Sequence, residues 1–370
     1  MKITILSHNL SSNASMRAHR LALAAARFAE VEVIGPVEKG GLWPALPKEP
    51  WIRTVVECRF PRFYRSFLEL VERCETADVI IAVKPQLASY GAALVASERY
   101  GVPVVLDVDD LDTGFAPREE WGSKPSMVDL NRPGSAVFVS LLSRAGSAAA
   151  AVTAASSALQ QRFGGTLIPH GSQTELFDPA QVDRDRAREE FGFSGPTVLF
   201  AGTPRWHKGL KPLAKAVGAV PGATLAVLCR EEDLSEKSWA RYPLKRLSPV
   251  AYPDLPRLLA AADLVAVPQL DTPVTRFQMP MKIYDCMAMA KPIVASAISD
   301  LPSVLEGCGL LVPPGEPEPL AQAIARLLHD PRLAAELGQR ARQRCLAEFS
   351  IARLAELLQG VVTPIQRRVP

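Results

Sequence analysis

Short apolar runs alternate with longer helical patterns along almost the whole of this chain. In the first half the predicted strands are Ile3–Leu6, Val31–Ile34, Val79–Ala82, Val102–Leu106, Ala151–Ala154 and Thr166–Ile168. The helical patterns between them are Met16–Phe28, Phe63–Cys74, Leu87–Tyr100 and Ala136–Ala148. Such alternation is typical of parallel strands joined by crossover helices. It predicts an α/β fold built on a doubly wound sheet.

The second half repeats the pattern. Its predicted strands are Thr197–Ala201, Thr224–Leu228, Leu264–Val267 and Pro292–Ala295, and its predicted helices are Leu210–Val217, Pro253–Ala261, Met281–Ala288, Pro319–His329 and Pro331–Glu348. A length of 370 residues fits two domains. We therefore expect domains at 1–171 and 172–350, with a polar hinge stretch over Ser172–Arg188. The segment 351–370 contains a last helix, Ile351–Val361, whose leucine stripe is expected to pack back on the first domain.

Composition excludes several function classes. Hydrophobic residues make up 48% and charged residues 22%, as in a globular protein, and the net charge of +3 has no basic tail for nucleic acid. The six cysteines lack a CxxC spacing, so neither a zinc site nor a disulfide framework is indicated. The start at Met1 reads as a strand rather than a signal peptide, and no stretch is long and apolar enough to span a bilayer. These features predict a cytoplasmic protein.

Two loops carry candidate chemistry. The loop after Ile3–Leu6 lacks the GxGxxG pattern of a dinucleotide site, which argues against a dehydrogenase. In the segment 200–209, Gly202 and Gly209 permit tight turns, and Arg205 and Lys208 bring two cations suited to a diphosphate. An ordinary solvated basic loop is the alternative interpretation.

A second segment, Pro280–Ser296, is predicted to begin a helix at Pro280. The free N–H groups of a helix start favour anion binding. Asp285 lies one turn into this helix. The alternative is a surface ion pair between Lys282 and Asp285, which are three positions apart.

Together these motifs resemble the retaining glycosyltransferases of family 4, the glycosyl transferases group 1, which have the two-domain GT-B fold with Rossmann-like domains. The resemblance rests on Gly202…Lys208-Gly209, Ala262–Pro268, Pro280–Ser296 and Gly309–Gly315 in this order, and on Ile168-Pro169-His170-Gly171 with Phe177 and Pro179. The first hundred residues match weakly, as expected of an acceptor-binding domain.

The resemblance implies an enzyme that transfers a sugar from a nucleoside diphosphate, such as UDP or GDP, to a hydroxyl acceptor. Retention of anomeric configuration, with no metal or other cofactor, is implied as well. Lys208 and Arg205 would hold the diphosphate, and Asp285 stands where the family has a Glu that binds the ribose hydroxyls. The candidate donor-binding set is Gly202, Thr203, Arg205, Lys208, Gln278, Met279, Met281, Lys282 and Asp285, and the candidate catalytic set is Asp109, Asp110, Arg205 and Lys208.

Three departures from the family pattern concern the donor site. Phe277 occupies the place of the family's first Glu, and Gln278-Met279-Pro280 replaces the Gly-Phe-Gly that often follows it. Thr203 stands where an Arg usually follows the Gly of the phosphate loop, which leaves Arg205 as its substitute. We therefore expect contacts to the transferred sugar to differ from those of the family.

An acidic cluster follows the predicted strand Val102–Leu106, in the sequence Asp107-Val108-Asp109-Asp110-Leu111-Asp112. Many members of the family have a His close to the place of Asp109, and an Asp there is able to accept or orient the proton of an acceptor hydroxyl. The same acidic motif resembles the metal-binding DxD motif of GT-A transferases. On that interpretation the protein would be a metal enzyme. A helix-capping role for Asp109 or Asp110 is a further alternative.

Three other features remain open. Ser12, Asn13, Ser15 and Arg17 follow the first strand where GT-B enzymes place an acceptor and phosphate loop, although Ser15 as a simple helix N-cap is the safer interpretation. His170 is expected to be structural. In the stretch Arg59–Phe67, aromatic side chains entering the core are favoured over weak peripheral contact with a membrane.

Two other functions compete with sugar transfer, and the leading function implies certain partners. A nucleotide-sugar epimerase or phosphorylase on the same fold is one competing function, and a non-catalytic sugar-nucleotide binding protein is another. The expected partners are a nucleotide-sugar donor and a small-molecule, glycan or lipid-linked acceptor, with no nucleic acid. The base, the sugar and the acceptor depend on pocket shape, which fold analogy does not supply.

Overall fold

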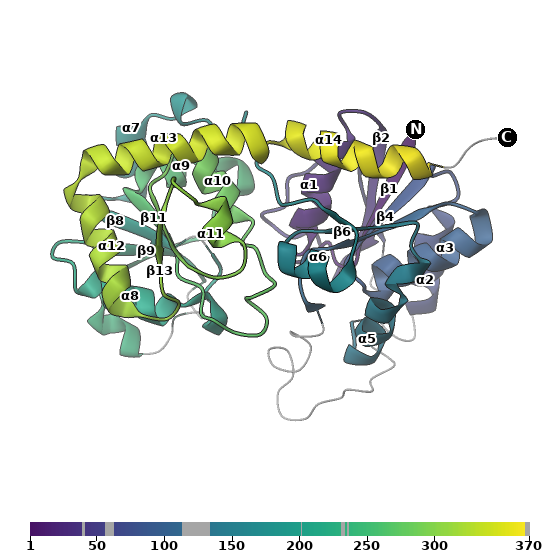
Figure 1. The fold of residues 1–370 in the computed structure, drawn as a ribbon, viewed down its shortest axis with the longest axis horizontal. Coiled ribbons are helices and arrows are strands. Elements are labelled where there is room, and N and C mark those ends of the chain that lie inside the picture. Colours follow the sequence, from purple (N-terminus) through teal and green to yellow (C-terminus); the bar gives the residue numbers. More distant parts are fainter. Residues whose placement is uncertain are drawn as a thin grey trace. The chain divides into compact units, whose positions relative to one another are not determined.

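The computed structural model describes residues 1–38, 41–55, 63–112, 134–200, 202–230, 234 and 237–366. The chain divides into two compact units: Met1–His170 together with the last segment from Ile351 form the first, and Gly171–Ser350 form the second. Figure 1 shows a sheet in each unit with helices on both of its sides. The predicted α/β class with doubly wound parallel sheets is confirmed.

The first unit is built on a parallel sheet in the order β3-β2-β1-β4-β5-β6-β7. Its strands are β1 Lys2–Ser7, β2 Glu30–Pro36, β3 Ile52–Val55, β4 Val79–Val83, β5 Val104–Val108, β6 Ala151–Ala154 and β7 Thr166–Leu167. All residues of β4 are buried, because helices cover both faces of a parallel sheet. Burying each valine or isoleucine side chain stabilises the fold by about 1.5–3 kcal/mol.

Four of the described helices of the first unit contact one another in two pairs. The helices of this unit are α1 Ser15–Ala25, α2 Phe63–Glu72, α3 Ala92–Tyr100, α5 Ala136–Arg144, α6 Ser157–Phe163 and α14 Ile351–Val362. Helix α14 contacts α1, and its Leu354 and Leu358 are fully buried (Figure 1). Helix α2 contacts α3. The last segment of the chain therefore completes the hydrophobic core of the first unit.

The second unit has a parallel sheet in the order β10-β9-β8-β11-β12-β13. Its strands are β8 Thr197–Phe200, β9 Thr224–Leu228, β10 Leu244–Leu247, β11 Leu264–Val267, β12 Ile293–Ser296 and β13 Leu310–Val312. Its helices are α7 Arg184–Phe191, α8 Leu210–Gly218, α9 Leu255–Ala261, α10 Lys282–Ala288, α11 Leu301–Val304, α12 Pro317–His329 and α13 Pro331–Glu348. The central β8 and β11 are fully buried.

Several element predictions need correction. The sequence pattern did not predict β3, β10 or β13, and all three are short, half-exposed strands at or beside a sheet edge. The expected polar stretch Ser172–Arg188 contains the start of α7, which Asp183 caps by accepting a hydrogen bond from the backbone N–H of Arg186. Strand β5 ends two residues later than predicted, so Asp107 lies inside it.

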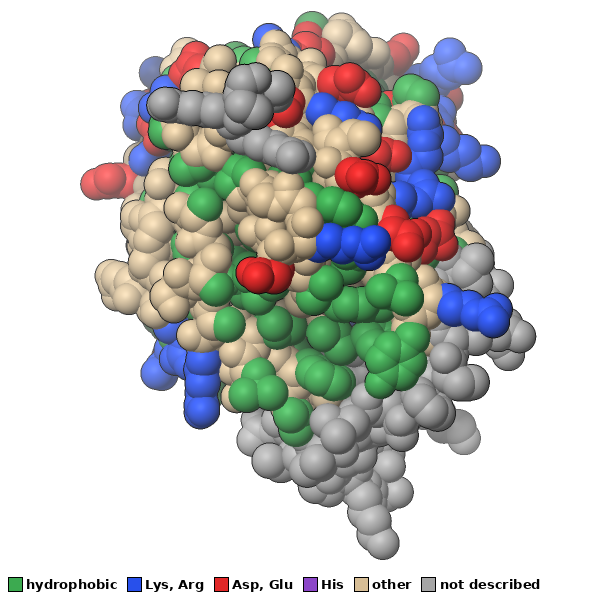
Figure 2. All heavy atoms as spheres, turned by 90° about the vertical axis from the view of Figure 1, so that its right-hand side faces the viewer, with side chains coloured by type: hydrophobic (Ala, Val, Ile, Leu, Met, Phe, Trp, Pro, Cys, Tyr) green, Lys and Arg blue, Asp and Glu red, His purple; other side chains and the backbone are tan. Residues whose placement is uncertain are grey.

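Helix α2 carries part of the basic and aromatic stretch Arg59–Phe67. Residues 59–62 lie outside the described part of the chain. Tyr64 is 63% exposed, so the expectation that the aromatics of this stretch enter the core is wrong for Tyr64. Figure 2 shows hydrophobic side chains gathered on the side of the molecule where α2 and α3 lie in Figure 1. Within the described ranges, no helix combines the length and apolarity needed to cross a membrane.

Candidate functional site

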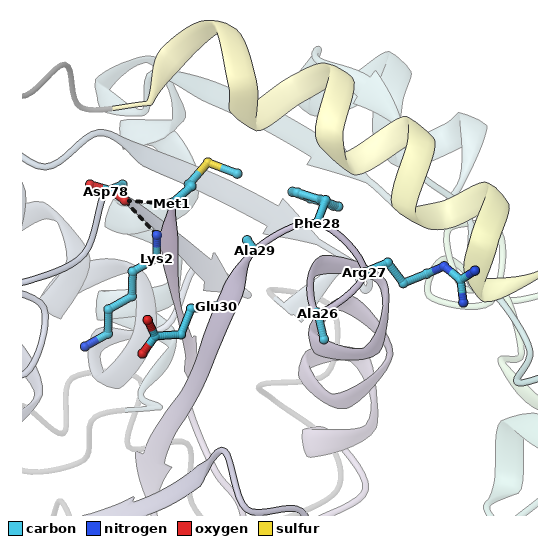
Figure 3. Close-up of a pocket in the computed structure, with 8 residues that line it drawn as sticks. All are labelled: Met1, Lys2, Ala26, Arg27, Phe28, Ala29, Glu30 and Asp78. Atoms are coloured by element: carbon cyan, nitrogen blue, oxygen red, sulfur yellow. Dashed lines mark hydrogen bonds and ion pairs between the residues drawn. The ribbon is translucent and has the colours of Figure 1, made fainter.

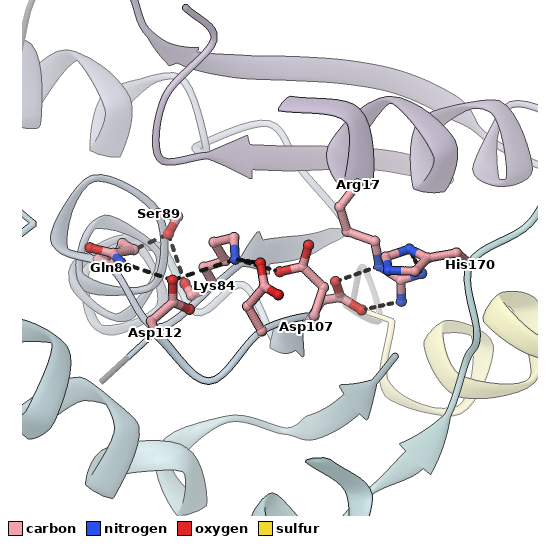
Figure 4. Close-up of polar contacts among 9 residues, drawn as sticks. Arg17, Lys84, Gln86, Ser89, Asp107, Asp112 and His170 are labelled. Carbon is pink, nitrogen blue, oxygen red and sulfur yellow. Dashed lines mark hydrogen bonds and ion pairs between the residues drawn. The ribbon is translucent and has the colours of Figure 1, made fainter. Parts of the chain in front are cut away.

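Three neighbouring strands of the first unit end at the same edge of the sheet. His8 follows β1, Lys84 follows β4 and Asp109 follows β5, and these strands pair in register. The Nζ atom of Lys84 lies 2.9 Å from Asp109 Oδ1 and 2.7 Å from Asp110 Oδ2. It also lies 3.4 Å from Asp112 Oδ1 (Figure 4). The predicted residues Asp109 and Asp110 thus share one ammonium group, rather than each standing alone as a helix cap.

Burial shapes the electrostatics of this acidic cluster. Burial alone lowers the pKa of Lys84, but Asp109, Asp110 and Asp112 together raise it well above its usual value. Burial raises the pKa of Asp109 to about 7, although the attraction of Lys84 opposes that rise. Burial raises the pKa of Asp112 as well. The cluster is therefore able to take up or release a proton near neutral pH.

Arg17, which was predicted to belong to the acceptor and phosphate loop after β1, lies in the helix that follows this loop. It is fully buried in α1, and its guanidinium binds Asp107 through Nε–Oδ2 at 2.9 Å and Nη2–Oδ1 at 2.8 Å. The same group donates to the carbonyls of Ile168 and Pro169 and contacts His170 Nδ1 at 3.4 Å. These contacts engage all of the donors that an arginine carries. Arg17 is a structural residue that ties α1 to β5 and the end of the first unit.

Of the other predicted residues after β1, Ser15 is buried like Arg17. Helix α1 begins at Ser15, whose hydroxyl donates to the carbonyl of Ser12 at 2.7 Å, and its N-cap is Ala14. The N-cap interpretation of Ser15 is therefore wrong. Ser12 is half-buried and Asn13 is exposed. Their role toward an acceptor or phosphate stays a prediction.

In the second unit, two predicted donor segments meet. Lys208 lies in the loop that follows β8, and its ammonium donates a hydrogen bond to the side-chain oxygen of Gln278. Gln269, which follows β11, approaches the same oxygen at 3.5 Å. Arg205 and Thr203 are exposed in the loop after β8, whereas Met279 is buried in the core. Lys208 and Gln278, seventy positions apart in sequence, form one polar corner.

The loop after β8 passes very close to the backbone after β11. Gly209 has φ +71°, and a Cβ atom on it would lie 1.7 Å from the carbonyl oxygen of Pro268. No side chain fits at this distance, so glycine is required both for the backbone conformation and for the space. This close approach fixes where Lys208 emerges from the loop.

We expect Gly209→Ala to lower the free energy of unfolding of the second unit by about 2–4 kcal/mol, since it adds both a clash and an unfavourable φ. Gly202→Ala is the matched control in the same loop, because a Cβ there meets only the Phe200 ring at 3.4 Å. Urea unfolding followed by circular dichroism measures both. Equal stability of the two variants would contradict this account of the loop.

Helix α10 carries the remaining predicted donor residues. It begins at Lys282 rather than Pro280, with Met281 as its N-cap. Asp285 is only 3% exposed and accepts a hydrogen bond from Ser172 Oγ at 2.7 Å, so the interpretation as a surface ion pair is wrong. Burial lowers the pKa of Lys282. Lys282, Asp285 and Cys286 line a small apolar space with leucines of β8, β9 and α9. The ribose contact of Asp285 stays a prediction.

A hollow at the surface of the first unit lies away from these groups. It has a volume of about 680 Å³ and is bordered by Met1, Lys2, Asp78 and residues 26–30 (Figure 3). Asp78 accepts a hydrogen bond from the backbone N–H of Lys2 at 2.6 Å and lies 3.9 Å from the terminal ammonium. These residues lie at the amino ends of the strands, opposite to the acidic cluster, and we assign the hollow no chemistry.

The sequence analysis missed three residues at or beside the acidic cluster, namely Lys84, His8 and Gln86. The sequence could have predicted the position of Lys84, because it follows a predicted buried strand. Neighbouring parallel strands end at the same edge of a sheet, so Lys84 and Asp109 could have been expected to lie close together. Across the ranges that the structure describes, no group of three His, Cys, Asp or Glu side chains is arranged to hold a metal ion.

Comparison with known proteins places these observations in context. Residues 195–330 match the family model of the glycosyl transferases group 1. The alpha-D-kanosaminyltransferase of Streptomyces kanamyceticus is 24% identical over 208 residues, which cover 52% of this chain and 52% of that protein. The alpha-maltose-1-phosphate synthase of Mycolicibacterium smegmatis is 26% identical over 326 residues, or 78% of this chain and 79% of its own length. The chain spans about half the length of the first of these relatives.

Solved structures resemble the chain over nearly its whole length. The sucrose-phosphate synthase from Thermosynechococcus elongatus has a TM-score of 0.74 at 20% identity, covering 98% of each chain. Anabaena HepE in complex with UDP-glucose has a TM-score of 0.74 at 18% identity, covering 98% of this chain and all of that one. The resemblance expected from the motifs is therefore confirmed: residues 195–330 match the glycosyl transferases group 1, and the chain has the GT-B fold of solved glycosyltransferases.

Proposed function

We propose that this protein is a glycosyltransferase that moves a sugar from a nucleoside diphosphate to a hydroxyl of an acceptor, with retention and without a metal ion. The observation that carries the proposal is the contact between Lys208 and Gln278. It joins the loop after β8 to the segment before α10, and both lie inside the part of the chain that matches the family model. The donor would bind at this polar corner.

The chemistry at the donor corner is electrostatic. As the glycosidic bond to phosphate breaks, negative charge develops on the departing diphosphate. The ammonium of Lys208 and the exposed guanidinium of Arg205 are suited to stabilise that charge. Asp285, buried on α10, would accept hydrogen bonds from the ribose hydroxyls. Stabilising the leaving group in this way requires no second carboxylate at a glycosidase spacing.

The acceptor would interact with the acidic cluster of the first unit. Asp109 has a pKa raised to about 7 by burial, the range in which a carboxylate accepts a proton and releases it again at neutral pH. We assign Asp109 the task of accepting or orienting the acceptor hydroxyl, with Asp110 beside it. The acceptor would be a small molecule, a glycan or a lipid-linked molecule.

The relatives support a nucleotide-sugar donor. Two curated relatives are named for glycosyl transfer or for synthesis of a glycosyl phosphate, and one solved relative holds UDP-glucose.

Thermal-shift measurements against UDP-, GDP-, ADP- and TDP-sugars test donor binding. A ligand that binds only the folded state at roughly 100 times its Kd stabilises it by about 2.7 kcal/mol. We expect one base to raise Tm in proportion to the logarithm of concentration, while free sugar and free nucleoside do not. A panel in which no nucleotide-sugar raises Tm would refute the donor assignment.

Product analysis then separates the competing functions. An epimerase changes the bound sugar without an acceptor, a phosphorylase needs inorganic phosphate, and a non-catalytic protein binds the donor and leaves it intact. We expect turnover that depends on an acceptor hydroxyl and that persists when EDTA is added. Turnover abolished by EDTA and restored by Mg²⁺ or Mn²⁺ would contradict metal independence.

A further inference from the structure

We propose that Lys84 is a positioning residue of the acceptor side: its ammonium gathers Asp109, Asp110 and Asp112 and sets how the Asp109 carboxylate is presented. This inference rests on the proposed function, because it assigns Lys84 a task in the same reaction. Lys84 itself is 4% exposed and does not need to touch substrate for that task. Figure 4 shows Lys84 in the middle of the row of polar side chains that runs from Gln86 and Asp112 to Arg17 and His170.

The contacts of Lys84 fix both its backbone and its side chain. Its backbone N–H donates to the carbonyl of Asp107 at 2.8 Å, and its own carbonyl accepts from Ser89 Oγ at 2.8 Å. Its ammonium reaches Asp109, Asp110 and Asp112 within 3.4 Å. The backbone is thus tied to β5 on one side and to the following turn on the other, so the ammonium is held at one place.

The backbone of Lys84 is strained. It has φ +71°, and within the described ranges it is one of three residues other than glycine with positive φ, together with Ala290 and Ser299. A side chain in this region costs about 1–2 kcal/mol, and glycine would adopt it without cost. Strain of this kind persists where the side chain has a task that glycine lacks. For Lys84 that task is to supply positive charge to three buried carboxylates.

The remaining charged groups near the acidic cluster do not replace Lys84. Asp107 and Arg17 bind each other from β5 and α1. His8 and His170 also face the cluster, and burial lowers both of their pKa values, which keeps them neutral. The positive charge of Arg20 on α1 also lowers the pKa of His170. Removing the lysine ammonium would therefore leave the cluster of carboxylates with a large excess of negative charge.

Unfolding measurements on the free protein provide a test that needs no enzymatic activity. Lys84→Gly relieves the strain and removes the charge, whereas Ala290→Gly relieves a similar strain without touching any carboxylate. We expect Ala290→Gly to be as stable as the wild type or slightly more stable. Lys84→Gly should be less stable at pH 8 and should approach the wild type at pH 5.

The sign of this pH dependence follows from proton linkage. Without Lys84, the pKa values of the buried carboxyls rise further above their unfolded values, so the folded state binds more protons than the unfolded state. Stability then falls as pH rises from about 5 to 8. If Lys84→Gly is as stable at pH 8 as Ala290→Gly, the lysine does not hold the carboxylates and the proposal is overturned.

Kinetics test the task of Lys84 in transfer. We expect Lys84→Met to lower kcat/KM for the acceptor by about tenfold or more at pH 7 and to leave KM for the donor almost unchanged. The acidic limb of the pH profile should move upward by about one to three units, because Lys84 lowers the pKa of Asp109. Lys84→Arg, which keeps the charge, should restore part of the activity.

The outcomes separate this inference from the proposed function. Transfer by the wild type, with a pH profile that Lys84→Met leaves in place, would overturn the positioning role and leave the proposed function standing. A wild type that transfers no sugar from any donor would overturn the proposed function. In that case the unfolding measurements still decide whether Lys84 gathers the carboxylates.

Discussion

Replacing Arg17 by methionine should lower the free energy of unfolding of the first unit by about 3–5 kcal/mol. The reason is that the substitution leaves the Asp107 carboxylate without its charged partner. Asp107 is fully buried in β5, where its carboxylate accepts two hydrogen bonds from the Arg17 guanidinium and one from Thr153 Oγ1 at 2.7 Å. Without Arg17 the carboxylate is an uncompensated buried charge, and the carbonyls of Ile168 and Pro169 lose their donor.

A double variant is the control for this prediction. Arg17→Met combined with Asp107→Leu removes both charges, and apolar replacement of a buried pair is often close to neutral. We therefore expect the double variant to recover part of the lost stability. Urea unfolding of the wild type, both single variants and the double variant gives the coupling energy. A loss below about 1 kcal/mol for Arg17→Met would show that Arg17 is not the structural tie described above.

The second large effect is expected at Lys208. Lys208→Ala should reduce transfer by about 10²–10³-fold, the usual loss when one preorganised group that stabilises a developing charge is removed. Nucleotide-sugar affinity should fall as well, because the proposed contact of Lys208 with the diphosphate would already form in the ground state. The Lys208 ammonium also holds Gln278 in place, so its loss frees that side chain.

Lys215→Ala is the matched control for Lys208→Ala. Lys215 is exposed on α8 of the same unit, so it changes the net charge equally without touching the polar corner. Steady-state kinetics and donor titrations should show Lys215→Ala close to the wild type. Equal activity and equal donor affinity of the two variants would place the phosphate site elsewhere.

Local patterns predicted the buried elements of the fold well. The all-apolar strand β4 and the fully buried β8 and β11 stand out in the sequence because helices cover both faces of such strands. Short, half-exposed strands such as β3 and β10 mix polar and apolar residues, and they were missed. Helix α7 was missed for a related reason, because only Ala187 of its residues is buried.

The site was harder to predict because partners distant in sequence decide what a charged residue does. Arg17 followed a predicted loop, yet Asp107, ninety positions later, draws it into the core. The sequence pattern did not predict a role for Lys84, yet Lys84 is the common partner of Asp109 and Asp110. Lys208 and Gln278 were both assigned to the donor by family resemblance, and the structure adds that they touch.

The most direct test of the central claim is phosphorus and proton NMR of one reaction. The donor that gives the largest thermal shift is incubated with an acceptor panel and the wild-type protein. We predict release of the nucleoside diphosphate in equal amount to a new glycoside with the anomeric configuration of the donor, and only when acceptor is present. A donor that stays intact with every acceptor, or a sugar that is epimerised without one, would contradict the account.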